Sequence, residues 1–306
     1  MSADWSEQAE NFLPNLSSVV GDYAMRSAFY GYKPRAGNET LNLSNLAVLS
    51  GKEAARYMCQ YSGFKHIIIG VQNINSNMYD YQHVFSNCLS LSCVEFPNLS
   101  GISSPNQGYA LESMCNNCPN IVSTLFPALK NIFSGYHTFK TAWYNCPKIK
   151  YIEFPELTAI NSAGGGFSDA IGVDNSHSAN GSLVEMHFPK LTALGWSGNN
   201  GYSPFNTMCS QANATRRHTF KLYFDSMVSF KGGSSASYAT FYKNRGLIDI
   251  YLPSLTGFTT SYVFNSCSEL TGIHFGAANQ AAIESSAGYA TLWGRGAGAA
   301  TVYYDL

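Results

Sequence analysis

Cysteine and histidine are the residue types of this chain that could ligate a metal or act as a nucleophile and its base. The 306 residues include eight cysteines and seven histidines. No HExxH, GxSxG, P-loop or dinucleotide-binding motif connects them. Cys115 and Cys118 form a CxxC pair, but the second pair that such a zinc site needs is missing. We therefore expect no metal site, no cofactor and no catalytic residue, and we predict that the chain is not an enzyme.

The spacing of the cysteines indicates a structural role instead. In three segments a cysteine is followed three residues later by Leu or Ile and nine residues later by proline, and Cys267 stands nine residues before Gly276. We call this ninth residue the anchor of its repeat, and weaker copies of the pattern have anchors at the same place. The anchors are Gly70, Pro97, Pro127, Pro155, Pro189, Asp225, Pro253 and Gly276, separated by 27, 30, 28, 34, 36, 28 and 23 residues. A period near 28 residues is typical of a solenoid made of stacked repeats.

Equivalent residues of successive solenoid turns lie one above another. We therefore expect Cys88, Cys118, Cys146 and Cys267 to be reduced thiols stacked in the interior. Stacked neighbours are also close enough to oxidise, so the number of cysteines does not decide the compartment.

The residues before each anchor alternate between apolar and polar, which predicts one short strand per repeat. The positions one and three before the anchor are apolar and are predicted to face the core, for example Phe154 and Ile152. The first of these two positions gives a column of mostly aromatic residues, which we expect to stack as a continuous spine. Its members are Ile69, Phe96, Phe126, Phe154, Phe188, Phe224, Leu252 and Phe275.

The side chains at the intervening strand positions are predicted to point outward and therefore do not pack in the core. Two residues before the anchors the column is Ile68, Glu95, Leu125, Glu153, His187, Tyr223, Tyr251 and His274. Four residues before the anchors it is His66, Cys93, Ser123, Tyr151, Glu185, Lys221, Asp249 and Gly272.

Tyrosine, histidine and carboxylate side chains are concentrated in the C-terminal half of these two columns. Tyrosine offers a large amphipathic contact area, and charged groups give directional hydrogen bonds. The high strand propensity of aromatic residues explains the same pattern without a ligand, so both interpretations stay open. The predicted ligand-binding residues are Tyr151, Glu153, Glu185, His187, Lys221, Tyr223, Asp249, Tyr251 and His274.

The repeated pattern F-x-x-C-x-x-L-x-x-I-x-F-P-x-L-x-x-I resembles the BspA-like class of leucine-rich repeats over residues 56 to 276. The resemblance implies a right-handed leucine-rich repeat solenoid with one short parallel strand per turn, about eight repeats in all. It also implies a relation to surface proteins of host-associated bacteria that bind partners and do not catalyse reactions. Asn244 stands where the pattern has cysteine, and the repeats anchored at Pro189 and Asp225 are irregular.

Three segments are expected within one continuous structural domain: an N-terminal cap over residues 1–55, the solenoid over 56–276 and a C-terminal cap over 277–306. At the junction of the first cap, Ser50 and Glu53 have the spacing of a capping box, which predicts a short helix over Gly51–Tyr57. The C-terminal cap is predicted to contain a helix and a final strand.

Composition limits the possible partners. Lys and Arg number 18 and Asp and Glu 19, and charged residues are 12% of the chain, about half the usual share. A nucleic-acid partner is therefore not expected, and no apolar run is long enough for membrane insertion.

We predict a non-catalytic recognition or adhesion module, extracellular or at a bacterial cell surface, that binds host protein or glycan. The first residues show no signal peptide. This absence favours the alternative of a phage or prophage virion protein for surface decoration or receptor binding.

Overall fold

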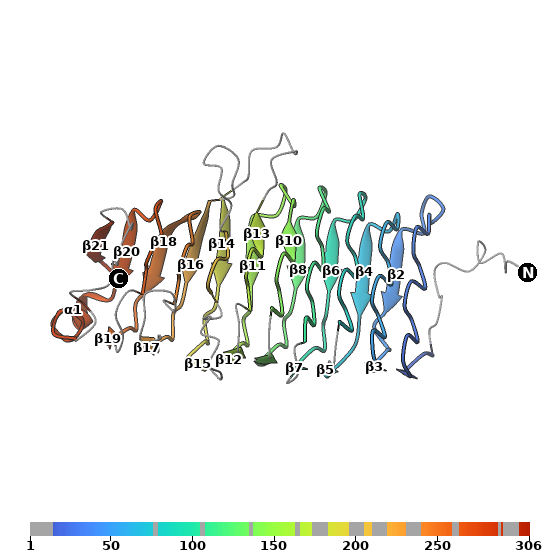
Figure 1. Cartoon of the computed structure of the whole chain (residues 1–306), viewed down its shortest axis with the longest axis horizontal. Coiled ribbons are helices and arrows are strands. Elements are labelled where there is room, and N and C mark those ends of the chain that lie inside the picture. Colours follow the sequence, from blue (N-terminus) through green and yellow to red (C-terminus); the bar gives the residue numbers. More distant parts are fainter. Residues whose placement is uncertain are drawn as a thin grey trace, which may run out of the picture.

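In the computed structural model, each turn of the chain places short strands beside the equivalent strands of the turn before. The turns follow one another along the long axis of the molecule (Figure 1). The structure describes residues 15–75, 79–104, 108–134, 137–162, 166–172, 183–195, 205–209, 219–230, 240–258, 263–286, 289 and 300–306. The molecule is a parallel β-solenoid of about eight turns that are roughly 28 residues apart, which confirms the predicted fold class.

The strands that precede the anchors, with one more strand at each end, form one side of the solenoid, which we call the face sheet. All their pairings are parallel, and the face sheet consists of a four-stranded and a six-stranded part. The four-stranded part contains β2 (Thr40–Leu43), β4 (His66–Ile69), β6 (Cys93–Glu95) and β8 (Ser123–Leu125). The six-stranded part contains β11 (Tyr151–Glu153), β14 (Val184–His187), β16 (Phe220–Tyr223), β18 (Leu247–Leu252), β20 (Gly272–Phe275) and β21 (Thr301–Tyr304).

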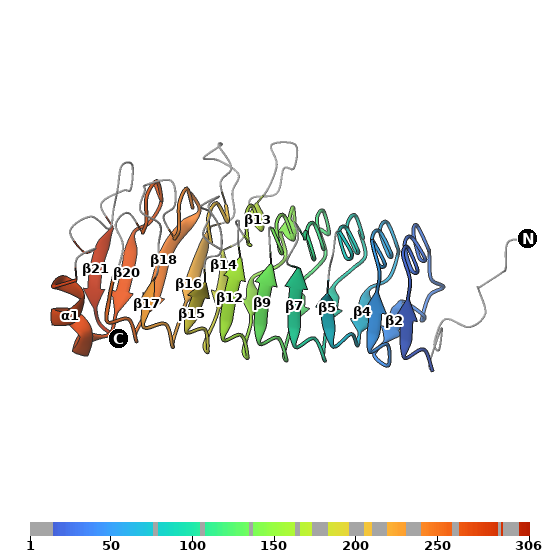
Figure 2. The same cartoon turned by 60° about the horizontal axis from the view of Figure 1, so that its bottom comes forward.

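Most turns have a second short strand, which the sequence pattern did not predict. It begins a few residues after the anchor and contains a buried apolar residue, such as Ile102. Figure 2 shows several of these strands in a row along the solenoid. They are β5 (Asn73–Asn75), β7 (Gly101–Ser104), β9 (Asn131–Ser134), β12 (Ala159–Ser162) and β15 (Ala193–Gly195) in one sheet, and β17 (Ser229–Phe230) with β19 (Gly257–Phe258) in another.

Consecutive β-turns form another part of each solenoid turn. The amide of Met58 donates to the Ala55 carbonyl at 3.0 Å, whereas the amide of Cys59 donates to Val84 of the next solenoid turn at 2.8 Å. Successive amides thus alternate: one donates to a carbonyl within its own segment, and the next donates to a carbonyl of the following solenoid turn. The predicted helix over Gly51–Tyr57 is wrong, because Glu53 and Tyr57 have φ of 55° and 59° and helical i→i−4 bonding is replaced by this alternation.

Two stacked aromatic columns fill the core. The predicted spine is confirmed from Phe96 to Phe224, with ring centroids 5.1–5.5 Å apart and planes within 16° of parallel. A second column comes from the β-turn segments and meets the first edge-on, as where Phe154 contacts Phe167 at 5.9 Å and 81°. Its members are Phe139, Phe167, Phe205, Phe241 and Phe264.

The buried thiols bond each turn to the one before it. Cys88 donates to the carbonyl of Cys59 at 2.9 Å, and Cys267 donates to that of Phe241 at 2.7 Å. Asn244 replaces cysteine in this ladder and donates to the Phe205 carbonyl at 2.6 Å. All eight cysteines are free thiols, and seven of them are buried.

Strands of the same parallel type continue at both ends of the solenoid. At the N-terminal end β1 (Ser18–Val20) pairs with β3 (Val48–Ser50), and β2 pairs with β4. At the C-terminal end a 3-10 turn (Ala277–Asn279) and α1 (Gln280–Glu284) precede β21, which pairs with β20. Between Trp143 and Gly172 lies one further small sheet, made of β10 (Trp143–Tyr144) and β13 (Ile171–Gly172). In the part of the chain that is described, no helix is long and apolar enough to cross a membrane.

Candidate functional site

All nine residues that the sequence predicted to bind a ligand lie on the face sheet. The strand register aligns them in two rows, because side chains on the same side of neighbouring parallel strands stand next to each other. We call the surface made by the nine residues the ladder face. In the first row Glu153 pairs with His187, followed by Tyr223, Tyr251 and His274. In the second row Tyr151 pairs with Glu185, followed by Lys221, Asp249 and Gly272.

From His187 onward, the first row is a continuous stack of rings. The centroids of His187 and Tyr223 are 4.0 Å apart, and those of Tyr223 and Tyr251 are 4.4 Å apart with an angle of 4° between the planes. His274 lies 4.4 Å beyond Tyr251. Each inner ring therefore has both faces covered by its neighbours. The ring edges and hydroxyl groups are the parts of these rings that the stacking leaves uncovered.

The stack extends one residue further than the sequence predicted. Tyr303 of β21 packs on His274 with a centroid distance of 4.6 Å and an angle of 9°. It was missed because β21 belongs to the C-terminal cap and has no anchor from which to count. The alternation in the segment Thr301–Tyr304 was the available signal.

The second row alternates in charge. The Lys221 ammonium lies 3.2 Å from the Asp249 carboxylate, and both side chains are mostly buried. Burial lowers the pKa of Lys221, but the hydrogen bond and the charge of Asp249 outweigh it, and the net effect raises the pKa. Gly272 follows Asp249, and a Cβ atom there would collide with the Asp249 carboxylate. The glycine therefore leaves space for the Asp249 side chain.

His274 lies between two carboxylates. Its Nε2 is 4.0 Å from Asp249, and its Nδ1 is 3.2 Å from both carboxylate oxygens of Asp305. Asp305 comes directly after the last strand, so counting back from anchors could not find it.

Glu185 of β14 connects the two rows. Tyr223 donates a hydrogen bond from its hydroxyl to Glu185 Oε1 at 3.4 Å, and His187 Nε2 lies 3.7 Å from Glu185 Oε2. Burial and the Glu185 charge raise the pKa of Tyr223, which keeps its hydroxyl protonated and able to donate. His187 Nε2 is buried without a hydrogen-bond partner. This nitrogen is therefore an unpaired polar group beneath the surface of the ladder face.

The ladder face, taken together with the adjoining Tyr303, is most accessible at its two ends. Tyr151 is 45% exposed and Tyr303 is 40% exposed, whereas the rings between them are partly buried. Burial and the nearby Glu153 charge raise the pKa of Tyr151, so its phenol is available as a neutral donor. The arrangement can bind an extended partner through hydrogen bonds and ring edges.

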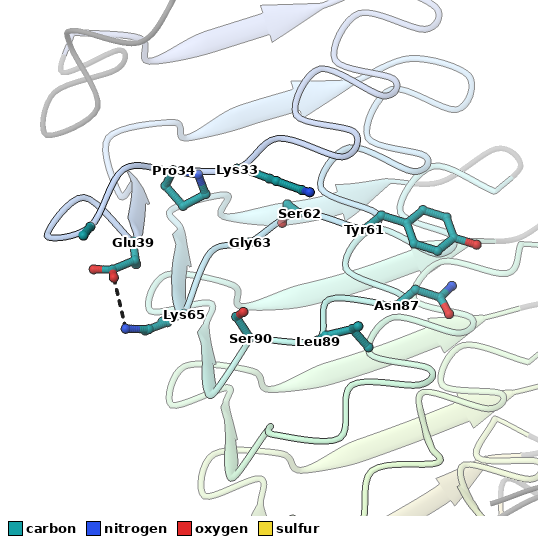
Figure 3. A pocket seen from close by; sticks show the side chains of 11 residues that line it. Lys33, Pro34, Glu39, Tyr61, Ser62, Gly63, Lys65, Asn87, Leu89 and Ser90 are labelled. Atoms are coloured by element: carbon teal, nitrogen blue, oxygen red, sulfur yellow. Dashed lines mark hydrogen bonds and ion pairs between the residues drawn. The ribbon is translucent and has the colours of Figure 1, made fainter.

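A pocket of about 510 Å³ lies elsewhere, between the first turns of the solenoid. Figure 3 shows Tyr61 and Asn87 on one side and the ion pair of Lys65 with Glu39, 3.0 Å long, on the other. The hydrogen bond from Lys65 lowers the pKa of Glu39. The pocket contains none of the nine predicted residues.

Comparison with known proteins gives one similar structure. No family model matches the chain, and no curated protein matches it. A leucine-rich repeat protein from Bacteroides ovatus is similar over 86% of this chain and 70% of that protein, with 13% sequence identity and a TM-score of 0.20. The description of the fold therefore rests on the strand register and the core of this chain.

Proposed function

We propose that this protein is a non-catalytic recognition module that binds a protein partner on the ladder face. The observation that carries the proposal is the continuous stack from His187 to Tyr303, which lies beside a row of charged groups. From β11 to β21 the six strands span about 24 Å at the usual strand spacing. Repeat solenoids use such extended surfaces for binding.

A protein partner fits this surface better than a glycan. Sugars pack against aromatic faces, but the inner rings of Tyr223 and Tyr251 already cover each other at 4.4 Å. The groups that remain are ring edges, phenol hydroxyls and carboxylates. Such groups recognise the hydrogen-bond donors of a polypeptide and its side chains.

The charges of the ladder face favour a partner with basic side chains. Its strand positions carry the carboxylates of Glu153, Glu185 and Asp249 against the single ammonium of Lys221. Carboxylates accept hydrogen bonds and attract Lys or Arg. We therefore expect the affinity to fall as the salt concentration rises.

The proposed setting is the exterior of a bacterial cell. Support for this part comes from the resemblance of the repeats to those of bacterial surface proteins. An adhesive role for the ladder face follows if the partner belongs to a host.

A binding survey tests the proposal. The protein and its Tyr223→Ala/Tyr251→Ala variant are applied to immobilised extracellular-matrix proteins and to a glycan array, with circular dichroism to show that the variant is folded. We expect saturable binding to a basic protein, and the variant should bind it with an affinity at least about tenfold lower, since interface tyrosines are often binding hot spots. Binding only to glycans, or equal binding by the folded variant, would contradict the proposal.

A further inference from the structure

We infer that His66, Cys93 and Glu95 form a binding site for a zinc-type divalent cation. This inference is independent of the proposed partner site. The three residues lie on β4 and β6, at the other half of the face sheet, where no sequence motif indicates a metal. Their donor atoms lie within 4.8 Å of one another.

The parallel register brings the three side chains together. His66 pairs with Cys93, and Ile68 pairs with Glu95 on the same two strands. In the sequence, 27 and 29 residues separate His66 from Cys93 and from Glu95, so no short motif reveals the cluster. Stacking one solenoid turn on the next creates it.

The distances suit a metal between the donors. His66 Nε2 lies 2.8 Å from Glu95 Oε1, and Cys93 Sγ lies 3.8 Å from the same oxygen. In a tetrahedral zinc site, bond lengths of roughly 2.0–2.3 Å put neighbouring donors about 3.3–3.7 Å apart. Small rotamer changes of these side chains would therefore open the space for the ion.

The choice of donors identifies the class of cation. Thiolate and imidazole select zinc and related transition metals, whereas magnesium and calcium prefer oxygen ligands alone. Three protein ligands leave a fourth position for water or for a donor from a partner. His66 and Glu95 are 33% and 31% exposed, so solvent reaches the site.

The location of Cys93 is the second reason for the inference. The other seven cysteines are buried in the solenoid, and only Cys93 lies on an outward strand position with partial exposure. Ser123, its neighbour in register on β8, hydrogen-bonds to Cys93 and can orient its sulfur. A half-exposed thiol beside a histidine and a carboxylate has the chemistry of a ligand.

Cobalt binding tests the inference directly. The reduced protein is first treated with a chelator, which is then removed. The protein is titrated with Co²⁺ in the absence of oxygen, and the thiolate-to-cobalt charge-transfer absorption is recorded. We expect one equivalent to bind, Zn²⁺ to displace it, and Cys93→Ser to abolish the absorption. His66→Gln and Glu95→Gln should each weaken Co²⁺ binding by about tenfold or more.

The structure provides a matched control in His187, which lies 3.7 Å from Glu185 on β14, and neither this strand nor its neighbours β11 and β16 contain a cysteine. His187→Gln should bind Co²⁺ as the unmodified protein does. In a second readout, a thiol reagent should label Cys93 in the folded protein, and Zn²⁺ should slow the labelling at least tenfold until a chelator is added. An unmodified protein without the absorption, or a folded Cys93→Ser variant that retains it, would overturn the inference.

Discussion

Replacing Asn244 by cysteine is expected to stabilise the protein, although it removes a buried hydrogen-bonding amide. Asn244 is fully buried, its Nδ2 donates to the Phe205 carbonyl at 2.6 Å, and its Oδ1 has no partner. A cysteine has no second polar atom to satisfy. In the equivalent position of the next turn, Cys267 donates to the Phe241 carbonyl at 2.7 Å.

The magnitude follows from these contacts. Removing the unpaired Oδ1 gains about 1–3 kcal/mol, and replacing an amide donor by a weaker thiol loses about 1 kcal/mol. The net gain for Asn244→Cys is thus about 1 kcal/mol. Asn244→Ala removes the donor as well and leaves a cavity, so it should be about 2 kcal/mol less stable than Asn244→Cys.

The free energy of unfolding of both variants is measured by urea unfolding under reducing conditions, monitored by far-ultraviolet circular dichroism. The reverse change, Cys267→Asn, serves as a control and should destabilise by about 2 kcal/mol, because it buries an unpaired amide oxygen. The reasoning is refuted if Asn244→Cys unfolds at lower urea than Asn244→Ala with an unchanged slope.

Three further predictions concern the core, the close approach of turns and the buried thiols. Phe154→Ala should lower the free energy of unfolding by about 3–5 kcal/mol, because the ring is fully buried and stacks on Phe126 and Phe188; a loss below about 1 kcal/mol in urea unfolding would argue against the spine. Gly70→Ala should destabilise by about 2–3 kcal/mol, since its Cβ would collide with the Ser44 backbone carbonyl, whereas Gly272→Ala should cost less than about 1 kcal/mol because the Asp249 side chain can move; equal thermal shifts would contradict this. Burial raises the pKa of Cys146 and Cys267 from 9.0 to about 12, so the stability that these thiols contribute is present below pH 9 and is lost as the pH rises toward 12, by about 1 kcal/mol per pH unit for each thiol. A urea midpoint that stays constant from pH 8 to pH 11 would disagree with that direction.

The rows of the face sheet could be predicted because the side-chain period of a strand is two and each repeat has an anchor. Counting back from the anchors placed Tyr223, Tyr251 and His274 in one row, as the register has them. Tyr303 and Asp305 could not be found in this way, because the C-terminal segment has no anchor. The same counting put His66 and Cys93 in one column, but only the register shows Glu95 within reach of both.

The β-turn segments were the least predictable part of the chain. Ser50 and Glu53 have the spacing of a capping box, but the amide of Glu53 bonds to Asp80 of the next turn at 2.9 Å. Hydrogen bonds between turns, which have no local sequence signal, decide this conformation. The second aromatic column was also missed, since its members vary in distance from the anchors.

The affinity of matched tyrosine variants for the partner found in the binding survey tests the central claim most directly. Tyr30 and Tyr61 form another pair of neighbouring rings, 5.5 Å apart and 53% and 51% exposed, at the N-terminal turns away from the ladder face. Removal of Tyr223 and Tyr251 should weaken binding at least about tenfold, while Tyr30→Ala/Tyr61→Ala binds as the unmodified protein does. Equal affinities of the two folded variants, or a loss confined to the Tyr30/Tyr61 variant, would show that the ladder face is not the binding surface.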